Sequence, residues 1–188
     1  MSSTPETPEC PLPSINRFIT THDESTGKAI FHNALPEQNP TEVLPNAAVF
    51  RLGYTTKDFP AQLNEDKDVN TYKEFLSSPP GLVASGGTVL RVVDAPPNSI
   101  SPMHRTVSLD YGIVLEGEVD LVLDSGEVRH MKRGDIAVQR GTMHAWRNNS
   151  STEWSRIVFV LQPCQPVVLA GQELKEDYAD MQGVKASE

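Results

Sequence analysis

The second half of the chain is a succession of short apolar runs separated by turn residues. From Gly87 the runs read TVLRVVDA, VSLDYGIVL, EVDLVL, EVRHM, DIAVQR, MHAWRN and RIVFVLQ. Turn signals such as Pro96-Pro97-Asn98 and Asp124-Ser125-Gly126 lie between them. Short, evenly spaced strands rich in Val, Ile and Leu are typical of a β-sandwich or β-barrel. Because no internal repeat is visible, the sequence predicts an all-β fold with one barrel and few short helices.

Four segments are expected along the chain. Residues 1–14 are rich in Ser, Thr, Pro and Glu and predict a disordered tail. Residues 86–170 hold the barrel, and residues 171–188 form a polar C-terminal tail whose last dozen residues are expected to fray. Residues 15–85 are expected to add strands that pack on the barrel or on a dimer partner. Their candidate strands are 15–20, 29–32 and 47–54, and a short helix is expected around 72–76.

Composition excludes several classes of partner. The chain has 188 residues, with 16 Lys and Arg against 25 Asp and Glu, and a formal net charge of −9. An acidic surface without a basic run disfavours nucleic acids and anionic membranes. No apolar stretch reaches the roughly 20 residues that span a bilayer. The N-terminal residues do not resemble a secretory signal, and Cys10 and Cys164 are interpreted as free thiols, so a cytoplasmic location is expected.

Two segments place chemically active side chains where a small barrel can gather them. His104 and Asp110 lie in the first segment, and His144 lies in the second. Two histidines and one carboxylate form a set that binds a catalytic divalent metal and leaves positions open for a substrate. We therefore take these three residues as candidate metal ligands and catalytic groups.

The same two segments resemble the motifs of the cupin superfamily. The first is HRTVSLDYGIVLEGE at 104–118, and the second is GDIAVQRGTMHAWRN at 134–148. The resemblance implies a double-stranded β-helix, the jelly-roll barrel of small single-barrel cupins found in fungi and bacteria. Three positions depart from the family pattern: Thr106 replaces a histidine, Asp110 replaces a glutamate and Arg140 replaces a proline.

These departures leave two interpretations of the site open. In one, His104, Asp110 and His144 hold Fe, Mn, Ni or Zn. Thr106 is then a further catalytic candidate, which bonds to the substrate or to a metal-bound water, or passes a proton. In the other, no metal is bound, and the same groups transfer protons or bind a ligand. The shorter side chain of Asp110 and the missing histidine weigh against a metal, and the metal-bound site is still the interpretation that we expect.

Three further residues are candidates for contact with the substrate. Ser108 shares the strand face of His104 and Thr106, because alternate residues of a strand point the same way. Trp146 shares the face of His144 and is expected either to stack on a flat ligand or to pack in the core. Arg140 is a candidate for a bidentate bond to a carboxylate, with a surface ion pair as the alternative.

The predicted function is an enzyme acting on a small molecule. Cupins that resemble this chain lie beside secondary-metabolite enzymes, which implies a small carboxylated, aromatic or polyketide-like substrate. Decarboxylation, dehydration, isomerisation or cyclisation is expected, with an iron-dependent dioxygenase as the alternative. A ligand-binding cupin that has lost its metal is the alternative of another class. The resemblance also implies a homodimer.

Overall fold

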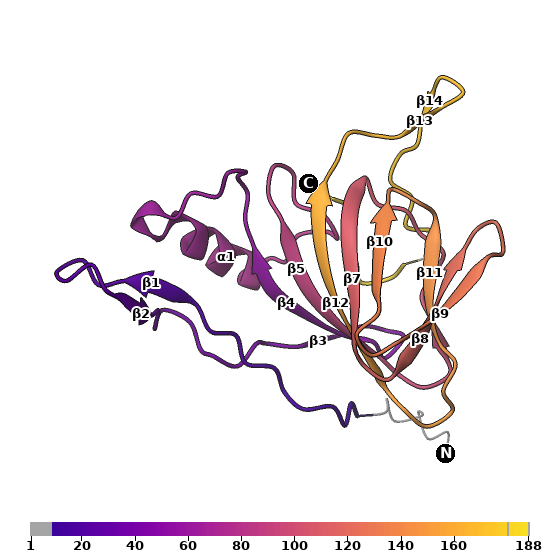
Figure 1. The fold of residues 1–188 in the computed structure, drawn as a ribbon, viewed down its shortest axis with the longest axis horizontal. Helices are drawn as coiled ribbons and strands as arrows, with labels where there is room; N and C mark the ends of the chain where they lie inside the picture. The colour runs from indigo at the N-terminus through magenta and orange to yellow at the C-terminus, as the bar shows by residue number, and fades with distance from the viewer. Residues whose placement is uncertain (1–8, 180, 188) are drawn as a thin grey trace, which may run out of the picture.

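A computed structural model of the chain describes residues 9–179 and 181–187. Two β-sheets form the body of the molecule (Figure 1), one with strand order β10-β7-β12-β5-β4-β3 and one with order β6-β11-β8-β9. The predicted all-β class and the double-stranded β-helix are confirmed. The larger sheet consists of β3 (Glu42–Val43), β4 (Val49–Thr55), β5 (Val89–Ala95), β7 (Ser108–Glu116), β10 (Ile136–Arg140) and β12 (Ser155–Pro163). The smaller sheet consists of β6 (Ser99–Ile100), β8 (Glu118–Leu123), β9 (Val128–Lys132) and β11 (His144–Asn148).

Alternation along the strands decides which side chains enter the barrel. In β7, Ser108, Asp110 and Val114 are buried, whereas Tyr111 is exposed. The pairing of β12 with β7 sets Leu161 opposite Asp110. Because a strand has a period of two residues, one register shift would move every inward side chain to the outside. The register therefore fixes the composition of the cavity wall.

The N-terminal half adds one helix and a small hairpin. Helix α1 (Lys67–Ser77), preceded by the 3₁₀ turn η1 (Asn64–Asp66), is longer than the predicted helix. It buries Tyr72, whose hydroxyl donates a hydrogen bond of 2.6 Å to the carbonyl of Leu52 in β4. The hairpin of β1 (Thr20–His22) and β2 (Ala29–Phe31) extends beside α1 and away from the barrel (Figure 1).

The C-terminal segment packs along the barrel instead of fraying. After the hairpin of β13 (Val168–Leu169) and β14 (Gln172–Glu173), Asp177 forms a backbone bridge with Arg105. The Tyr178 hydroxyl lies 2.6 Å from Ser187 Oγ, and Met181 packs against the main hydrophobic core. The sequence did not predict these contacts, because the segment is mostly polar and only its few apolar side chains pack against the core.

The N-terminal tail expected at 1–14 lies mostly outside the described residues. Of its described part, Pro13 accepts a hydrogen bond of 2.9 Å from Arg156 Nη1. Among the described residues, no helix combines the length and apolar character needed to cross a membrane.

Candidate functional site

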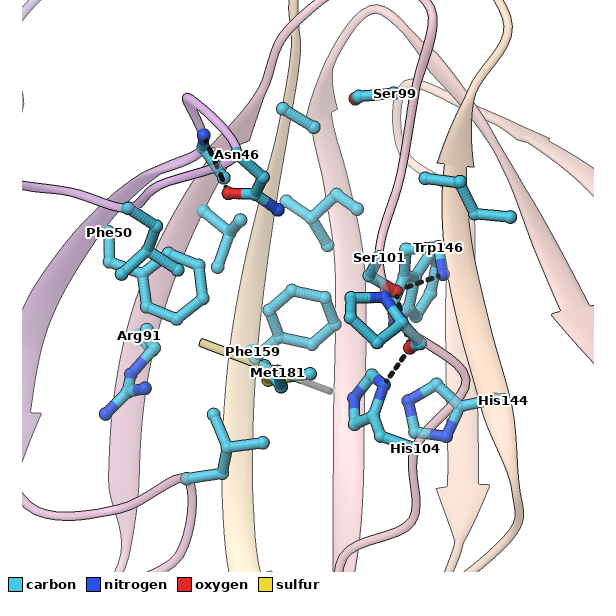
Figure 2. A pocket seen from close by; sticks show the side chains of 18 of the residues that line it. Asn46, Phe50, Arg91, Ser99, Ser101, His104, His144, Trp146, Phe159 and Met181 are labelled. Atoms are coloured by element: carbon cyan, nitrogen blue, oxygen red, sulfur yellow. Dashed lines mark hydrogen bonds between the residues drawn. The ribbon is translucent and has the colours of Figure 1, made fainter. Parts of the chain in front are cut away.

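A cavity of about 110 Å³ lies between the two sheets and receives side chains from both. Its wall is mainly apolar, and Figure 2 shows Phe50, Phe159 and Trp146 around it. His104, Thr106, Asp110 and His144 all line this cavity, so the barrel brings the predicted catalytic residues to one place.

The two histidines form a close pair at one side of the cavity (Figure 2). Their backbones exchange hydrogen bonds of 2.8 and 2.9 Å, and their rings lie 4.3 Å apart between centroids. Each Nδ1 faces a carbonyl, that of Pro102 for His104 at 2.8 Å and that of Thr142 for His144 at 2.9 Å. A carbonyl only accepts, so each Nδ1 carries the proton and each Nε2 keeps its lone pair.

Burial keeps both imidazoles neutral. It lowers the pKa of His104, and it lowers the pKa of His144 to about 3, with a smaller contribution from the neighbouring His104. A neutral imidazole with a free Nε2 accepts a hydrogen bond or a proton, and it does not supply positive charge.

Asp110 is a buried carboxylate held by a chain of hydroxyl groups. Ser108 Oγ donates to Thr106 Oγ1 at 2.7 Å, and Thr106 Oγ1 donates to Asp110 Oδ2 at 3.2 Å. Within the described residues, Oδ1 is buried and has no hydrogen-bond partner. Burial raises the pKa of Asp110 to about 6, and the two hydroxyl groups oppose that rise in part. This carboxylate has one oxygen fixed and the other unused.

Two residues of the cavity wall were missed in the sequence. Gln139 on β10 pairs in register with Asp110, and its buried Nε2 has no partner among the described residues. Arg91 on β5 is buried and also lines the cavity. The spacing in the sequence shows only that Arg91 shares a strand face with Val89 and Val93. Which face points inward depends on pairing with distant strands, and the sequence does not state it.

The three residues that were expected to contact the substrate differ in their position relative to the cavity. Trp146 lines the cavity and packs edge-to-face on Phe159, with 5.3 Å between centroids, so it is both a wall and a core residue. Ser108 is buried and acts through Thr106. Arg140 is exposed and does not line the cavity, because its position in β10 has the opposite phase to Gln139.

The donor set of the cavity fits a metal only in part. Within residues 9–179 and 181–187, no group of three or more His, Cys, Asp or Glu side chains is arranged to hold a metal ion. The free Nε2 atoms of the histidine pair suit a metal, because ligating histidines commonly donate their other N–H to a carbonyl. Asp110 is not part of such a group among the described residues. The assignment of a metal to His104, Asp110 and His144 therefore stays a prediction, and no chemical step is derived through a metal.

Comparison with known proteins places the chain in a family. Residues 91–160 match the family model described as "Cupin domain". "Phomopsin biosynthesis cluster protein D" of Diaporthe leptostromiformis is 50% identical over 92% of this chain and 90% of its own. "Cupin-domain-containing oxidoreductase virC" of Hypocrea virens is 41% identical over 85% of this chain and 82% of its own. The solved polyketide cyclase RemF of Streptomyces resistomycificus is 20% identical, with a TM-score of 0.46, over 72% of this chain and 81% of its own. The protein belongs to the cupin family, within a group of fungal cupin-domain proteins.

Proposed function

We propose that this cupin is a small-molecule enzyme of the lyase or isomerase type, which removes a proton from a carbon next to a carbonyl group. The observation that carries the proposal is Asp110, a buried carboxylate with an unused oxygen at the wall of an apolar cavity. Perturbed carboxylates in enclosed cavities are typical of general acid–base sites. The four reactions expected from the sequence share the need to move a proton or to stabilise an enolate.

Asp110 is the base in this proposal. With a pKa of about 6 it is ionised at neutral pH, and it is a stronger base than an ordinary aspartate. Thr106 fixes Oδ2, so Oδ1 accepts the proton. The substrate C–H bond breaks, a new O–H bond forms on Asp110, and the electron pair moves to the substrate carbonyl oxygen. Return of that proton to another carbon completes an isomerisation, and loss of a leaving group completes an elimination.

The developing enolate needs a hydrogen-bond donor, and Gln139 supplies one. Its Nε2 is buried, has no partner among the described residues and belongs to the residue that pairs with Asp110 across β10 and β7. Donors placed before the reaction stabilise developing negative charge far more in an enclosed site than in water. The neutral Nε2 atoms of His104 and His144 accept a hydrogen bond from a substrate hydroxyl group.

The substrate class follows from the wall and from the relatives. Trp146 and Phe159 offer aromatic surfaces for stacking a flat ring. The relatives bear names from fungal biosynthesis clusters. A small aromatic or polyketide-like carbonyl compound suits both observations.

Deuterium incorporation tests the proposal. The protein is incubated in D₂O with a panel of small aromatic and polyketide-like ketones and β-keto acids, and products are read by mass spectrometry. We expect deuterium at the carbon next to the carbonyl, with a rate that rises through a midpoint near pH 6 as Asp110 ionises. Asp110→Asn should lose at least a hundredfold. Absence of exchange across the panel, or exchange that Asp110→Asn leaves intact, would overturn the proposal.

An oxidoreductase is the second candidate, because four relatives are named as cupin-domain-containing oxidoreductases. The free Nε2 atoms of the histidine pair are the groups that would hold iron. This candidate predicts consumption of O₂ and near-stoichiometric iron that is lost in His144→Ala. The acid–base proposal predicts turnover in a sealed anaerobic cell and in the presence of a chelator. A cupin that only binds its ligand predicts neither exchange nor O₂ consumption.

A further inference from the structure

Arg91 is a buried cation in the cavity wall that the proposed chemistry does not use. It lies on the inner face of β5, opposite Phe159 of β12 and Leu52 of β4. Its side chain is among the most buried charged groups, with 6% of the residue exposed, and it lines the cavity together with Phe50. A cation in such a place costs free energy unless something compensates its charge.

The other two buried arginines show what compensation looks like in this protein. Arg51 and Arg156 lie on the opposite face of the same sheet, and both bind Asp94. Arg51 Nη1 lies 2.5 Å from Asp94 Oδ2, and Arg156 Nη2 lies 2.7 Å from the same oxygen. Arg91 has no carboxylate within 4.0 Å among the described residues, so it is the exception among these three buried arginines.

The contacts of Arg91 occupy part of its bonding capacity. Nη2 donates to the carbonyl of Gly81 at 3.0 Å, and the guanidinium carbon lies 5.3 Å from the centre of the Phe50 ring. A guanidinium has five N–H groups, and its planar fork matches the two oxygens of a carboxylate. Glu42 and Tyr178 act on it from longer range, and burial lowers its pKa to about 10, which leaves it charged at neutral pH.

The position of Arg91 sets the length of a ligand that reaches both ends of the cavity. Strand β12 lies between β5 and β7. Arg91 pairs with Phe159 of β12, whereas Asp110 pairs with Leu161, two residues further along that strand. With strands about 4.8 Å apart and a rise of about 3.4 Å per residue, the two Cα atoms are roughly 12 Å apart. Figure 2 shows Arg91 and the histidine pair at opposite sides of the pocket, with Phe159 and Met181 between them. Because side chains fill part of that separation, a ligand that reaches both ends of the cavity is shorter than it.

The geometry points to Arg91 as the anchor for a carboxylate of the substrate, at the opposite side of the cavity from the histidine pair. The apolar and aromatic wall between them holds the body of the molecule. A bidentate bond to Arg91 orients the ligand, so that its reacting carbon meets the other end of the cavity. The identity of that reacting end rests on the proposed function, whereas capture of a carboxylate by Arg91 does not. The substrate is thus a small molecule that carries a carboxylate, and Arg91 takes the role that the sequence offered to Arg140.

Binding of benzoate and of its neutral analogue benzamide tests the anchor without any turnover. Isothermal titration calorimetry at pH 7 should show wild-type protein binding benzoate at least tenfold more tightly than benzamide. Arg91→Gln should weaken benzoate binding tenfold or more and leave benzamide binding unchanged. Arg91→Lys keeps the positive charge but lacks the planar guanidinium group. Its affinity for benzoate should therefore lie between that of the wild type and that of Arg91→Gln. Arg140→Gln is the matched control, because Arg140 is exposed outside the cavity, and it should bind both compounds as wild type does.

The outcomes separate this inference from the proposed function. Arg91 also holds Gly81, so each variant is first checked for a wild-type circular dichroism spectrum and melting curve. If Arg91→Gln does not fold, the wild-type preference for benzoate and the Arg91→Lys titration decide the question. Equal affinities for benzoate and benzamide, no detectable benzoate binding, or wild-type benzoate affinity in folded Arg91→Gln would overturn the anchor. If Asp110→Asn binds benzoate as the wild type does but shows no deuterium exchange, the loss concerns the proposed catalytic role of Asp110 and leaves the Arg91 anchor supported.

Discussion

Burial gives Asp110 its basicity and also makes the folded protein less stable. Its pKa is about 6 in the folded state against an ordinary value of 3.8, so the folded state holds the proton more tightly. The contribution of Asp110 to the free energy of unfolding is therefore most favourable below pH 4, and it is lost as the pH rises through 6. Above that pH the ionised carboxylate costs about 3 kcal/mol, since one pKa unit corresponds to about 1.4 kcal/mol.

Asp110→Asn should therefore be inactive and yet more stable than wild type at pH 8. Asparagine keeps the shape of the side chain and still accepts the bond from Thr106, and it carries no charge. We expect a melting temperature several degrees higher at pH 8 and a difference that vanishes near pH 4. Differential scanning calorimetry at the two pH values measures it. A variant that is equally destabilised at both would show that Asp110 is structural.

Gly112 makes room for the aromatic wall of the cavity. A Cβ added there would lie 3.1 Å from Phe159 Cε1 and 3.2 Å from two ring atoms of Trp146. Gly112→Ala should push both rings aside, lower the free energy of unfolding by about 1–3 kcal/mol and shift the tryptophan fluorescence. Gly126→Asn is the control, because nothing lies within 4 Å of that position and asparagine tolerates a positive φ. Unchanged fluorescence and stability in Gly112→Ala would contradict the packing.

At the scale of single residues, the sequence indicates the site in part. His104, Asp110 and His144 occupy motif positions, and all three line the cavity. Gln139 and Arg91 do not occupy such positions. Arg91 lies in a run in which both phases are mostly apolar, so the pattern TVLRVVDA does not reveal its inner face.

Among the elements, the C-terminal segment differs most from what its composition predicts. Met181 lines the cavity and packs on the main core, far along the chain from the barrel strands. Strands of the barrel were readable because alternation and turn residues are local signals; β8 coincides with the run EVDLVL. A polar segment that packs through single apolar side chains shows no periodic pattern in the sequence. The sequence therefore predicted a frayed tail.

Met181→Ala should show whether that segment closes the cavity. Removal of the side chain enlarges the cavity and takes away contacts, at a cost of about 1–2 kcal/mol, below the usual value for a fully buried methionine. We expect weaker benzoate binding by calorimetry and a lower urea midpoint. Met143→Ala is the matched control, since Met143 is also half-buried but does not line the cavity. Equal effects of the two substitutions would mean that Met181 contributes packing and no closure.

At the scale of the whole molecule, two of the exposed apolar surfaces among the described residues bear on assembly. On the hairpin arm, Phe18, Ile30 and Phe31 are exposed, and the Phe18 and Phe31 rings pack edge-to-face at 6.1 Å. On the outer face of the larger sheet, Ile136 and Val138 are 65% and 55% exposed. Exposed apolar clusters of this kind mark contact surfaces, and Figure 1 shows the arm extending away from the barrel of its own chain.

A homodimer in which the arm packs on a second copy would cover these side chains, and it remains our prediction for the assembly. Light scattering coupled to size-exclusion chromatography should give twice the monomer mass of 20.7 kDa at micromolar concentration. Phe18→Ser/Phe31→Ser should give the monomer mass with unchanged benzoate affinity, because the arm does not line the cavity. Val128→Ser, at a partly exposed position on β9, should stay dimeric. A monomeric wild type at that concentration would leave the arm without a role in assembly.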